Sequence, residues 1–311
     1  MKINGKLIFK MASYAVVAAA VVYFFRSFYL RLDDIPHIEW NARSLAAVVL
    51  SVLGILFTNV LTGYVWRIQL KDHGVKLRPG KSIQIMLISQ FGKYLPGNVG
   101  HFAGRAALGS SAGVPVAVSM NTIMVDVLWH LAIGSTFAAL AAYFYSDTLR
   151  ELLPSHLEAP HLLAITGLLM FIPWIGITVM NKLMPGISRK IGKGELIATP
   201  SLRTALLVSA LILVGFHTLG AIVKLQAAWL FHVPQGEYYM ITVLYIASWT
   251  VGYVVPGAPG GVGVREAVMV LLLSPVVGEG AAVGLGISMR LTNMLGDALA
   301  FGLGMLSRRI L

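Results

Sequence analysis

Apolar residues form long runs along this chain, and polar residues gather in short stretches between them. A helix rises about 1.5 Å per residue, so about 20 apolar residues cross the hydrocarbon core of a bilayer. One further stretch, residues 83–112, is apolar but is interrupted by proline and glycine. The pattern predicts an all-α polytopic membrane protein. The predicted spans cover residues 11–25, 45–66, 114–145, 162–180, 205–230, 239–255, 262–277 and 281–306.

The composition supports the membrane class and excludes several others. Of the 311 residues, 57% are hydrophobic and 12% are charged, whereas ordinary soluble domains carry about 25% charged residues. The net charge of +11 therefore indicates cytoplasmic loops that face anionic lipid, and not a nucleic-acid partner. The chain has no cysteine, which excludes disulfides, a thiol nucleophile and a Cys-ligated metal. We expect a single membrane domain over residues 1–311.

The distribution of Lys and Arg between the spans predicts the orientation. These residues crowd both chain ends and the segments 67–81 and 181–203, whereas 146–161 has one and 232–237 has none. All the rich segments fall on one side if the N- and C-termini are both cytoplasmic. That arrangement requires residues 83–112 to enter and leave on the cytoplasmic side, which predicts a re-entrant segment. The first span has no small-x-small cleavage site after it, so we expect it to be retained.

Two segments of the chain share a pattern of proline, glycine and arginine at a constant separation of 160 positions. The four matching pairs are Pro96 and Pro256, Gly97 and Gly257, Gly100 and Gly260, and Arg105 and Arg265. The long spans fall into the same register, and the loop charges give the two halves opposite starting sides. The sequence therefore predicts an inverted-topology repeat, with residues 1–150 and 160–311 as its halves, each holding one Pro/Gly-broken re-entrant hairpin.

The broken hairpins are the strongest candidates for a binding site. Non-helical backbone survives within a bilayer only where protein buries it or where it lines a wet cavity. The freed N–H groups of the following half-helix attract anions, and an arginine is a bidentate partner for phosphate. The two arginines are expected to flank one central cavity. The candidate substrate-binding residues are Tyr94, Pro96, Gly97, Gly100, His101, Arg105, Pro256, Gly257, Gly260, Gly261, Arg265 and Glu266.

Plainer interpretations of the two arginines stay open at this point. Arg105 can be an interfacial side chain that snorkels towards the headgroups. Arg265 can pair with Glu266 or with loop carbonyls.

Further polar residues lie inside predicted spans, where charge is expensive and usually functional. Asp126 and His130 share a helix face at a spacing of four, as do Arg290, Asn293 and Asp297 in the last span. These five residues form a candidate intramembrane charge network, with Asp126, Arg290 and Asp297 as candidates for ion pairs. Structural pairing that only orders the helices is an equal alternative, and a proton relay through Asp126 and His130 is a weaker one.

Signatures of enzymes and metal sites are scarce. The chain has no Walker loop, HExxH, G-x-S-x-G or Cys/His cluster. Asp33, Asp34 and Glu39 form a small acidic cluster, but Arg31 and Arg43 flank it, so a self-neutralised loop is the favoured interpretation. We expect no cofactor, no metal and no enzymatic activity. The six tryptophans are expected mostly near span ends, in aromatic belts.

The two broken segments resemble a known family. The runs QFGKYLPGNVGHFAGR (90–105) and PGAPGGVGVREA (256–267) are similar to the signature stretches of the lysylphosphatidylglycerol synthase transmembrane-domain family, also described as flippase-like. The resemblance extends over nearly the whole chain. It implies the handling of phospholipids or polyprenyl-linked glycolipids across the bacterial inner membrane. In two-part members a soluble domain transfers an aminoacyl group, and because this chain ends at Leu311 that activity is not expected.

Three functions compete on these grounds. The leading hypothesis is a secondary lipid flippase whose ligand is an anionic phospholipid or a polyprenyl-phosphate-linked glycolipid. A membrane enzyme acting on lipid phosphates would use Asp126, His130 or Glu266 as acid or base. A non-catalytic membrane partner of envelope-synthesis enzymes is the third. The expected partners are an anionic lipid, the membrane itself and such enzymes, with no nucleic acid.

Overall fold

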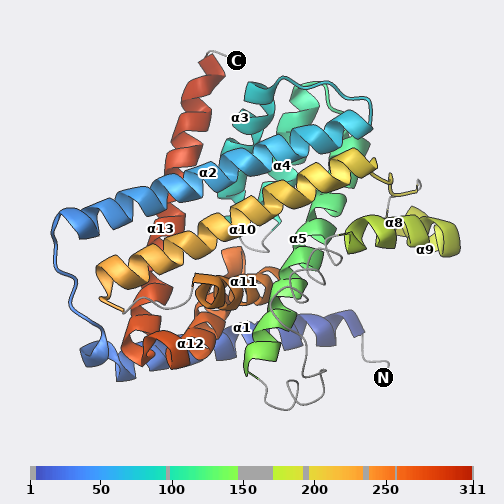
Figure 1. Cartoon of the computed structure of the whole chain (residues 1–311). Helices are drawn as coiled ribbons and strands as arrows, with labels where there is room; N and C mark the ends of the chain where they lie inside the picture. Colours follow the sequence, from blue (N-terminus) through green and yellow to red (C-terminus); the bar gives the residue numbers. More distant parts are fainter. Residues whose placement is uncertain are drawn as a thin grey trace, which may run out of the picture. The chain divides into compact units, whose positions relative to one another are not determined.

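The computed structural model describes residues 5–95, 99–145, 171–191, 196–233, 238–255 and 258–309, and over these ranges the chain is helical without a strand (Figure 1). The all-α class is confirmed. The α-helices are α1 (Gly5–Leu30), α2 (Ala42–Asp72), α3 (Pro79–Gln90), α4 (Gly100–Ser111), α5 (Val116–Tyr145), α8 (Ile172–Leu183), α9 (Pro185–Ile191), α10 (Leu202–Leu230), α11 (Tyr238–Val254), α12 (Val264–Val277) and α13 (Glu279–Leu306). The 3-10 helices are η1 (Leu32–Asp34), η2 (Phe91–Tyr94), η3 (Pro259–Gly261) and η4 (Ser307–Arg309).

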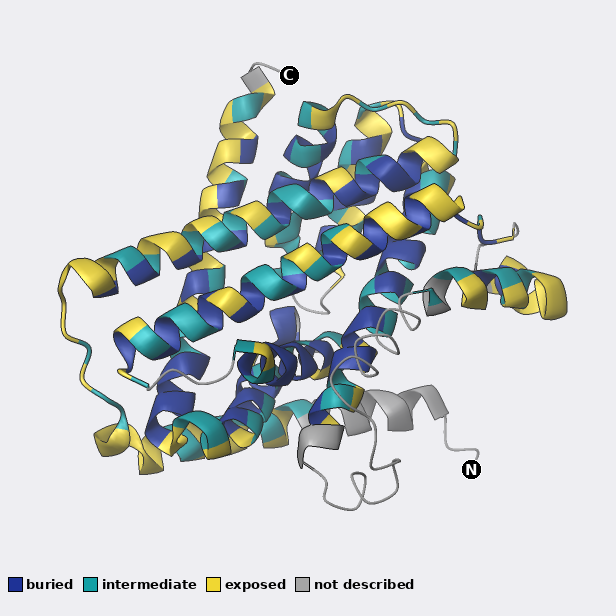
Figure 2. Cartoon of the chain, in the orientation of Figure 1, coloured by how far each residue is buried: buried dark blue, intermediate teal, exposed yellow. Residues whose placement is uncertain are grey.

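Several helices have the length and composition of membrane spans. In the part of the chain that the structure describes, α2, α10 and residues Val116–Ala142 of α5 meet both criteria, and Val17–Leu30 and Tyr238–Val254 are shorter apolar segments. Along α2, Leu45, Val49 and Leu53 lie exposed at a spacing of four, on one helix face. Figure 2 shows exposed positions recurring along this helix. An apolar face without a protein partner is stable against acyl chains. The chain is therefore a helical membrane protein.

Contacts between Cα atoms divide the chain into two compact units. The first consists of Met1–Leu56, Phe91–His101 and His217–Ala298. The second consists of Phe57–Gln90, Phe102–Phe216 and Leu299–Leu311.

The first unit is built around the pair α11 and α12. These two helices pack along each other, and α1 packs on α12. The pair needs a small residue at its contact, since a Cβ on Gly252 would lie 2.9 Å from the Cβ of Arg265. Polar bonds join α10 to α13: Gln226 Nε2 donates to Thr292 Oγ1 at 2.8 Å, and Ser288 Oγ donates to Gln226 Oε1 at 2.8 Å. Within a membrane such bonds hold helices together where apolar surface alone gives little preference.

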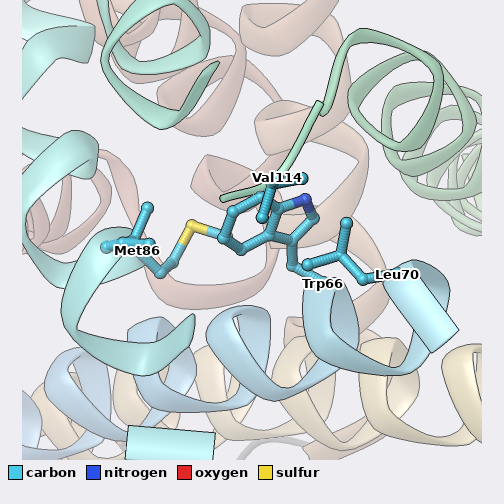
Figure 3. Packing of buried hydrophobic residues seen from close by; sticks show 5 residues of the cluster. Trp66, Leu70, Met86 and Val114 are labelled. Atoms are coloured by element: carbon cyan, nitrogen blue, oxygen red, sulfur yellow. The ribbon is translucent and has the colours of Figure 1, made fainter. Parts of the chain in front are cut away.

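The second unit has a core centred on an indole ring. Trp66 is fully buried and packs with Leu70, Met86 and Val114 from α2, α3 and the turn before α5 (Figure 3). Its Nε1 donates to Thr122 Oγ1 at 3.0 Å, which satisfies the polar end of the ring. The expectation of an interfacial belt is therefore wrong for Trp66, because its ring belongs to the protein interior.

Helix is interrupted in both motif segments. After α3 the chain forms η2 and resumes as α4, and after α11 it forms η3 and resumes as α12. Gly104 lies against Ser89, so α3 and α4 pack together in the second unit. Re-entry from one side of the membrane, the inverted repeat and the cytoplasmic position of both termini stay predictions. The predicted span at 162–180 overlaps α8, and its residues 162–170 lie outside the described residues, as do Pro96, Gly97, Pro256 and Gly257.

Candidate functional site

The two broken segments meet within the first unit. η2 contacts η3 there, and Arg290 of α13 connects them. The Nη1 atom of Arg290 donates to the carbonyl of Gly260 at 3.0 Å, and its guanidinium carbon lies 5.6 Å from the ring centroid of Tyr94. Two segments that lie far apart in the sequence are thereby joined through one cationic side chain. Tyr94 and Gly260, both expected to bind substrate, are brought together.

The turn between α11 and α12 depends on glycine. The φ angles of Gly260, Gly261 and Gly263 are +57°, +75° and +79°, a region that L side chains rarely adopt. Glu266 then caps the new helix, since the N–H of Gly263 donates to Glu266 Oε2 at 2.7 Å. One of the N–H groups expected to attract an anion is thus satisfied by a carboxylate of the chain itself. The role of Glu266 here is structural at least in part.

Glu266 also lies near an arginine, but the partner is Arg290. Its Oε1 atom is 3.6 Å from Arg290 Nη1, and Glu266 is 5% exposed. Arg265 takes another environment, with its guanidinium carbon 5.9 Å from the centroid of Trp249. Among the residues that the structure describes, no carboxylate forms an ion pair with Arg265. The alternative in which Arg265 pairs with Glu266 is therefore wrong.

A second carboxylate of the first unit is fully buried. Asp297 Oδ2 accepts from Lys93 Nζ at 2.7 Å and from Tyr94 OH at 2.6 Å. Asp297 was expected in a charge network, but Lys93 was not among the expected residues. The signal for Lys93 lay in the sequence, because this lysine precedes Tyr94 within the first motif run. Its pairing with Asp297 depends on the packing of α13 beside η2.

A small cavity lies between α11, α12 and α13. Its volume is about 10 Å³, roughly the space that one water molecule needs. Both Arg265 and Arg290 reach it, so two cations from different helices border one polar space. The lining residues are Tyr245, Arg265, Glu266, Met269, Gly286, Met289, Arg290 and Asn293. In this conformation a headgroup does not fit, and binding one requires the helices to separate.

Arg105 lies in the second unit and is 2% exposed. Its Nη1 atom is 3.1 Å from Asp126 Oδ2. His130 Nδ1 lies 2.9 Å from the Asp126 carbonyl oxygen and 3.4 Å from Asp126 Oδ1. A snorkelling role for Arg105 is therefore wrong, because protein buries its guanidinium. Its Nε atom is buried without a hydrogen-bond partner in the described part of the chain.

The expected intramembrane network thus consists of two clusters. Asp126 pairs with Arg105 and His130 in the second unit. Arg290 and Asp297 find their partners on the broken segments of the first unit, and Asn293 lines the small cavity there. That Arg105 and Arg265 flank one cavity stays a prediction.

The remaining expected residues have simpler surroundings. His101 lies at the start of α4 and is buried, and Gly100 packs on Gly92 of η2. In the acidic loop Arg31 pairs with Asp34 at 3.4 Å and also contacts Glu279. The described residues contain no group of His, Asp or Glu arranged to hold a metal ion.

Comparison with protein families gives a match over most of the chain. The family model described as the lysylphosphatidylglycerol synthase TM region matches residues 10–300, a range that contains both broken segments. No curated protein matches the chain.

Proposed function

The chain belongs to the lysylphosphatidylglycerol synthase transmembrane family, and from this premise we propose that it is a secondary flippase of the bacterial inner membrane. Its ligand is an anionic phospholipid or a polyprenyl-phosphate-linked glycolipid. The phosphate binds the cations beside the broken helices while the acyl or prenyl chains stay in the bilayer. The sequence has no P-loop motif, so we propose that transport runs downhill or on an ion gradient.

One observation carries the proposal: both broken segments converge on a cluster of cations within the first unit. Lys93, Arg265 and Arg290 provide three positive charges there, and Glu266 and Asp297 provide two negative charges. Charge inside a membrane protein is costly and usually marks a ligand or ion path. Guanidinium groups suit a phosphate because they donate two parallel hydrogen bonds.

The geometry suggests the order in which the cations engage. Arg265 has no carboxylate partner in the described part of the chain, and it already borders the cavity, so a phosphate meets it without breaking an ion pair. Arg290 is held more loosely by Glu266, at 3.6 Å, than Lys93 is held by Asp297, at 2.7 Å. We propose that the phosphate next takes Arg290 from Glu266. Because Arg290 also bonds the Gly260 carbonyl, its movement would loosen the η3 turn.

The test measures flipping in proteoliposomes that contain a fluorescent phosphatidylglycerol analogue. Arg265→Gln and Arg290→Gln should each lower the initial rate at least tenfold, since each removes a hydrogen bond to a charged phosphate worth roughly 1.5–3 kcal/mol. Arg203→Gln is the matched control, because Arg203 is an exposed arginine at the start of α10. Unchanged rates in both site variants would remove the proposed phosphate site.

The same vesicles separate the flippase from an enzyme. Mass spectrometry of the lipid after incubation should show an unaltered molecule. A chemically changed lipid, lost in Asp126→Asn, would favour catalysis by the Asp126–His130 pair over transport.

A further inference from the structure

A cationic groove lies in the second unit, away from the residues assigned above. It is bordered by α3, by the end of α4 and by η4, and its volume is about 300 Å³, within the range of small-molecule sites. Lys81 and Arg308 are the two cationic residues of its described lining. Ile88, Leu108 and Ala112 provide apolar surface in the same groove. The groove therefore combines the two kinds of surface that a membrane lipid presents.

The charge of the groove is unbalanced. Lys81 Nζ donates to Gln84 Oε1 at 2.7 Å, a neutral acceptor. Arg308 is exposed and has no ion-pair partner among the described residues. None of the described residues that line the groove is Asp or Glu. Two formal positive charges thus line one groove with no Asp or Glu among its described lining residues, which favours a ligand that carries negative charge.

The walls of the groove are held in place by contacts within the unit. Gln84 Nε2 donates to Ser307 Oγ at 3.1 Å, which ties α3 to η4 beside Arg308. On the apolar side, Leu108 and Ala112 also pack against the Trp66 core. A groove whose sides are fixed by other contacts binds a ligand with little loss of conformational entropy.

We infer that this groove binds the phosphate headgroup of an anionic phospholipid from the cytoplasmic leaflet. Lys81 and Arg308 contact the phosphate, and an acyl chain lies along Ile88 and Leu108. The orientation follows from the loop charges, since Lys81 ends a Lys/Arg-rich segment and Arg308 belongs to the Lys/Arg-rich C-terminus, both predicted to be cytoplasmic. Basic pockets between helices on that side suit anionic headgroups. Apolar walls beside the cations favour a lipid over a soluble anion.

Native mass spectrometry of the full chain in detergent tests this site, with phosphatidylglycerol titrated against phosphatidylcholine. The double variant Lys81→Gln/Arg308→Gln should lower the preference for phosphatidylglycerol roughly tenfold, because each cation near a lipid phosphate contributes on the order of a few-fold in affinity. The charge-preserving pair Lys81→Arg/Arg308→Lys should keep most of the preference. Lys76→Gln removes a nearby exposed lysine outside the groove and should change the preference less than twofold.

Two results would overturn the inference. An unchanged phosphatidylglycerol preference in the double variant would show that the groove holds no lipid. Displacement of the bound lipid by millimolar inorganic phosphate would identify a soluble-anion site instead. Neither result bears on the flippase, which depends on Arg265 and Arg290 and is measured by flipping, so the two proposals can fail separately.

Discussion

At the scale of single residues, the buried ion pair of Arg105 and Asp126 is the feature whose disruption should cost the most stability. Both side chains are almost fully enclosed, at 2% and 6% exposure, and their atoms approach to 3.1 Å. A buried pair contributes little net stability, but removing one partner leaves an unpaired charge and costs about 3–5 kcal/mol. We therefore expect Asp126→Ala to destabilise the protein by that amount. Unfolding titrations in mixed micelles measure the change.

The double variant Arg105→Met/Asp126→Leu provides the decisive comparison. It removes both charges and should return stability to near that of the wild type. Thr136→Ala is a control on the same helix, because it loses only a local bond to the Ala132 carbonyl and should cost less than about 1 kcal/mol. If the double variant were as unstable as Asp126→Ala, lost packing, and not an unpaired charge, would explain the loss of stability.

His73 offers a pH-dependent prediction outside the membrane spans. Burial lowers the pKa of His73 below its ordinary value of 6.5, and neighbouring Asp72 opposes this only in part. The unfolded chain then binds a proton at His73 more readily than the folded chain does. The free energy of unfolding therefore keeps the full contribution of neutral His73 above pH 6.5 and loses it as the pH falls below that value. The wild type should lose stability between pH 7 and 5 more steeply than His73→Gln. His37→Gln, at an exposed histidine, should keep the wild-type slope.

The motif arginines could be predicted from the sequence, but the contacts of the charged residues could not. The matched frames singled out Arg105 and Arg265, and both lie at buried or half-buried polar positions. The contacts within the first unit could not be predicted from the sequence. Lys93 pairs with Asp297, 204 positions further along the chain, and Arg290 bonds Gly260, 30 positions before it. Such contacts depend on helix packing, which a hydrophobicity pattern does not specify.

At the scale of elements, one carboxylate makes two contacts at the start of α12. Glu266 accepts the Gly263 N–H and lies near Arg290. Glu266→Gln keeps an acceptor for the cap and should unfold within about 0.5 kcal/mol of the wild type, whereas Glu266→Ala should lose about 1 kcal/mol. Thermal unfolding in detergent gives both values.

The two Glu266 variants also separate the roles in transport. Both free Arg290 from a negative charge, so both should bind anionic lipid more tightly. Weaker lipid binding in Glu266→Gln would contradict the competition proposed for Arg290. Lipid affinity is measured by the same native mass spectrometry as for the groove.

Elements were the most predictable level of this chain. Apolar runs predict α5 and α10 within three residues at each end and α2 within six, and the Pro/Gly clusters predict both helix breaks. The surroundings of Trp66 are less predictable, because an indole at the end of a predicted span suits a membrane interface and a protein core equally well. Only the packing of Met86 and Val114 around its ring decides between them.

At the scale of the whole molecule, the inverted repeat makes a labelling prediction that this chain is well suited to test. α2 begins at Ala42 and α10 at Leu202, which are again 160 positions apart, and each helix carries an exposed arginine at its second residue, Arg43 and Arg203. In an inverted repeat these equivalent positions lie on opposite sides of the membrane. The sequence has no cysteine, so a single introduced cysteine is the only thiol.

In spheroplasts, a membrane-impermeant maleimide should label Arg43→Cys and leave Arg203→Cys unmodified, since the loop charges predict the first outside and the second inside. After permeabilisation both should react, which controls for local accessibility, and Lys76→Cys should behave as Arg203→Cys does. Labelling of both equivalent positions from the same side would make the two halves parallel. The two hairpins would then not be related by inverted symmetry, and they could not provide equivalent openings to the two sides of the membrane. The cation cluster of the first unit would have to bind lipid from both leaflets.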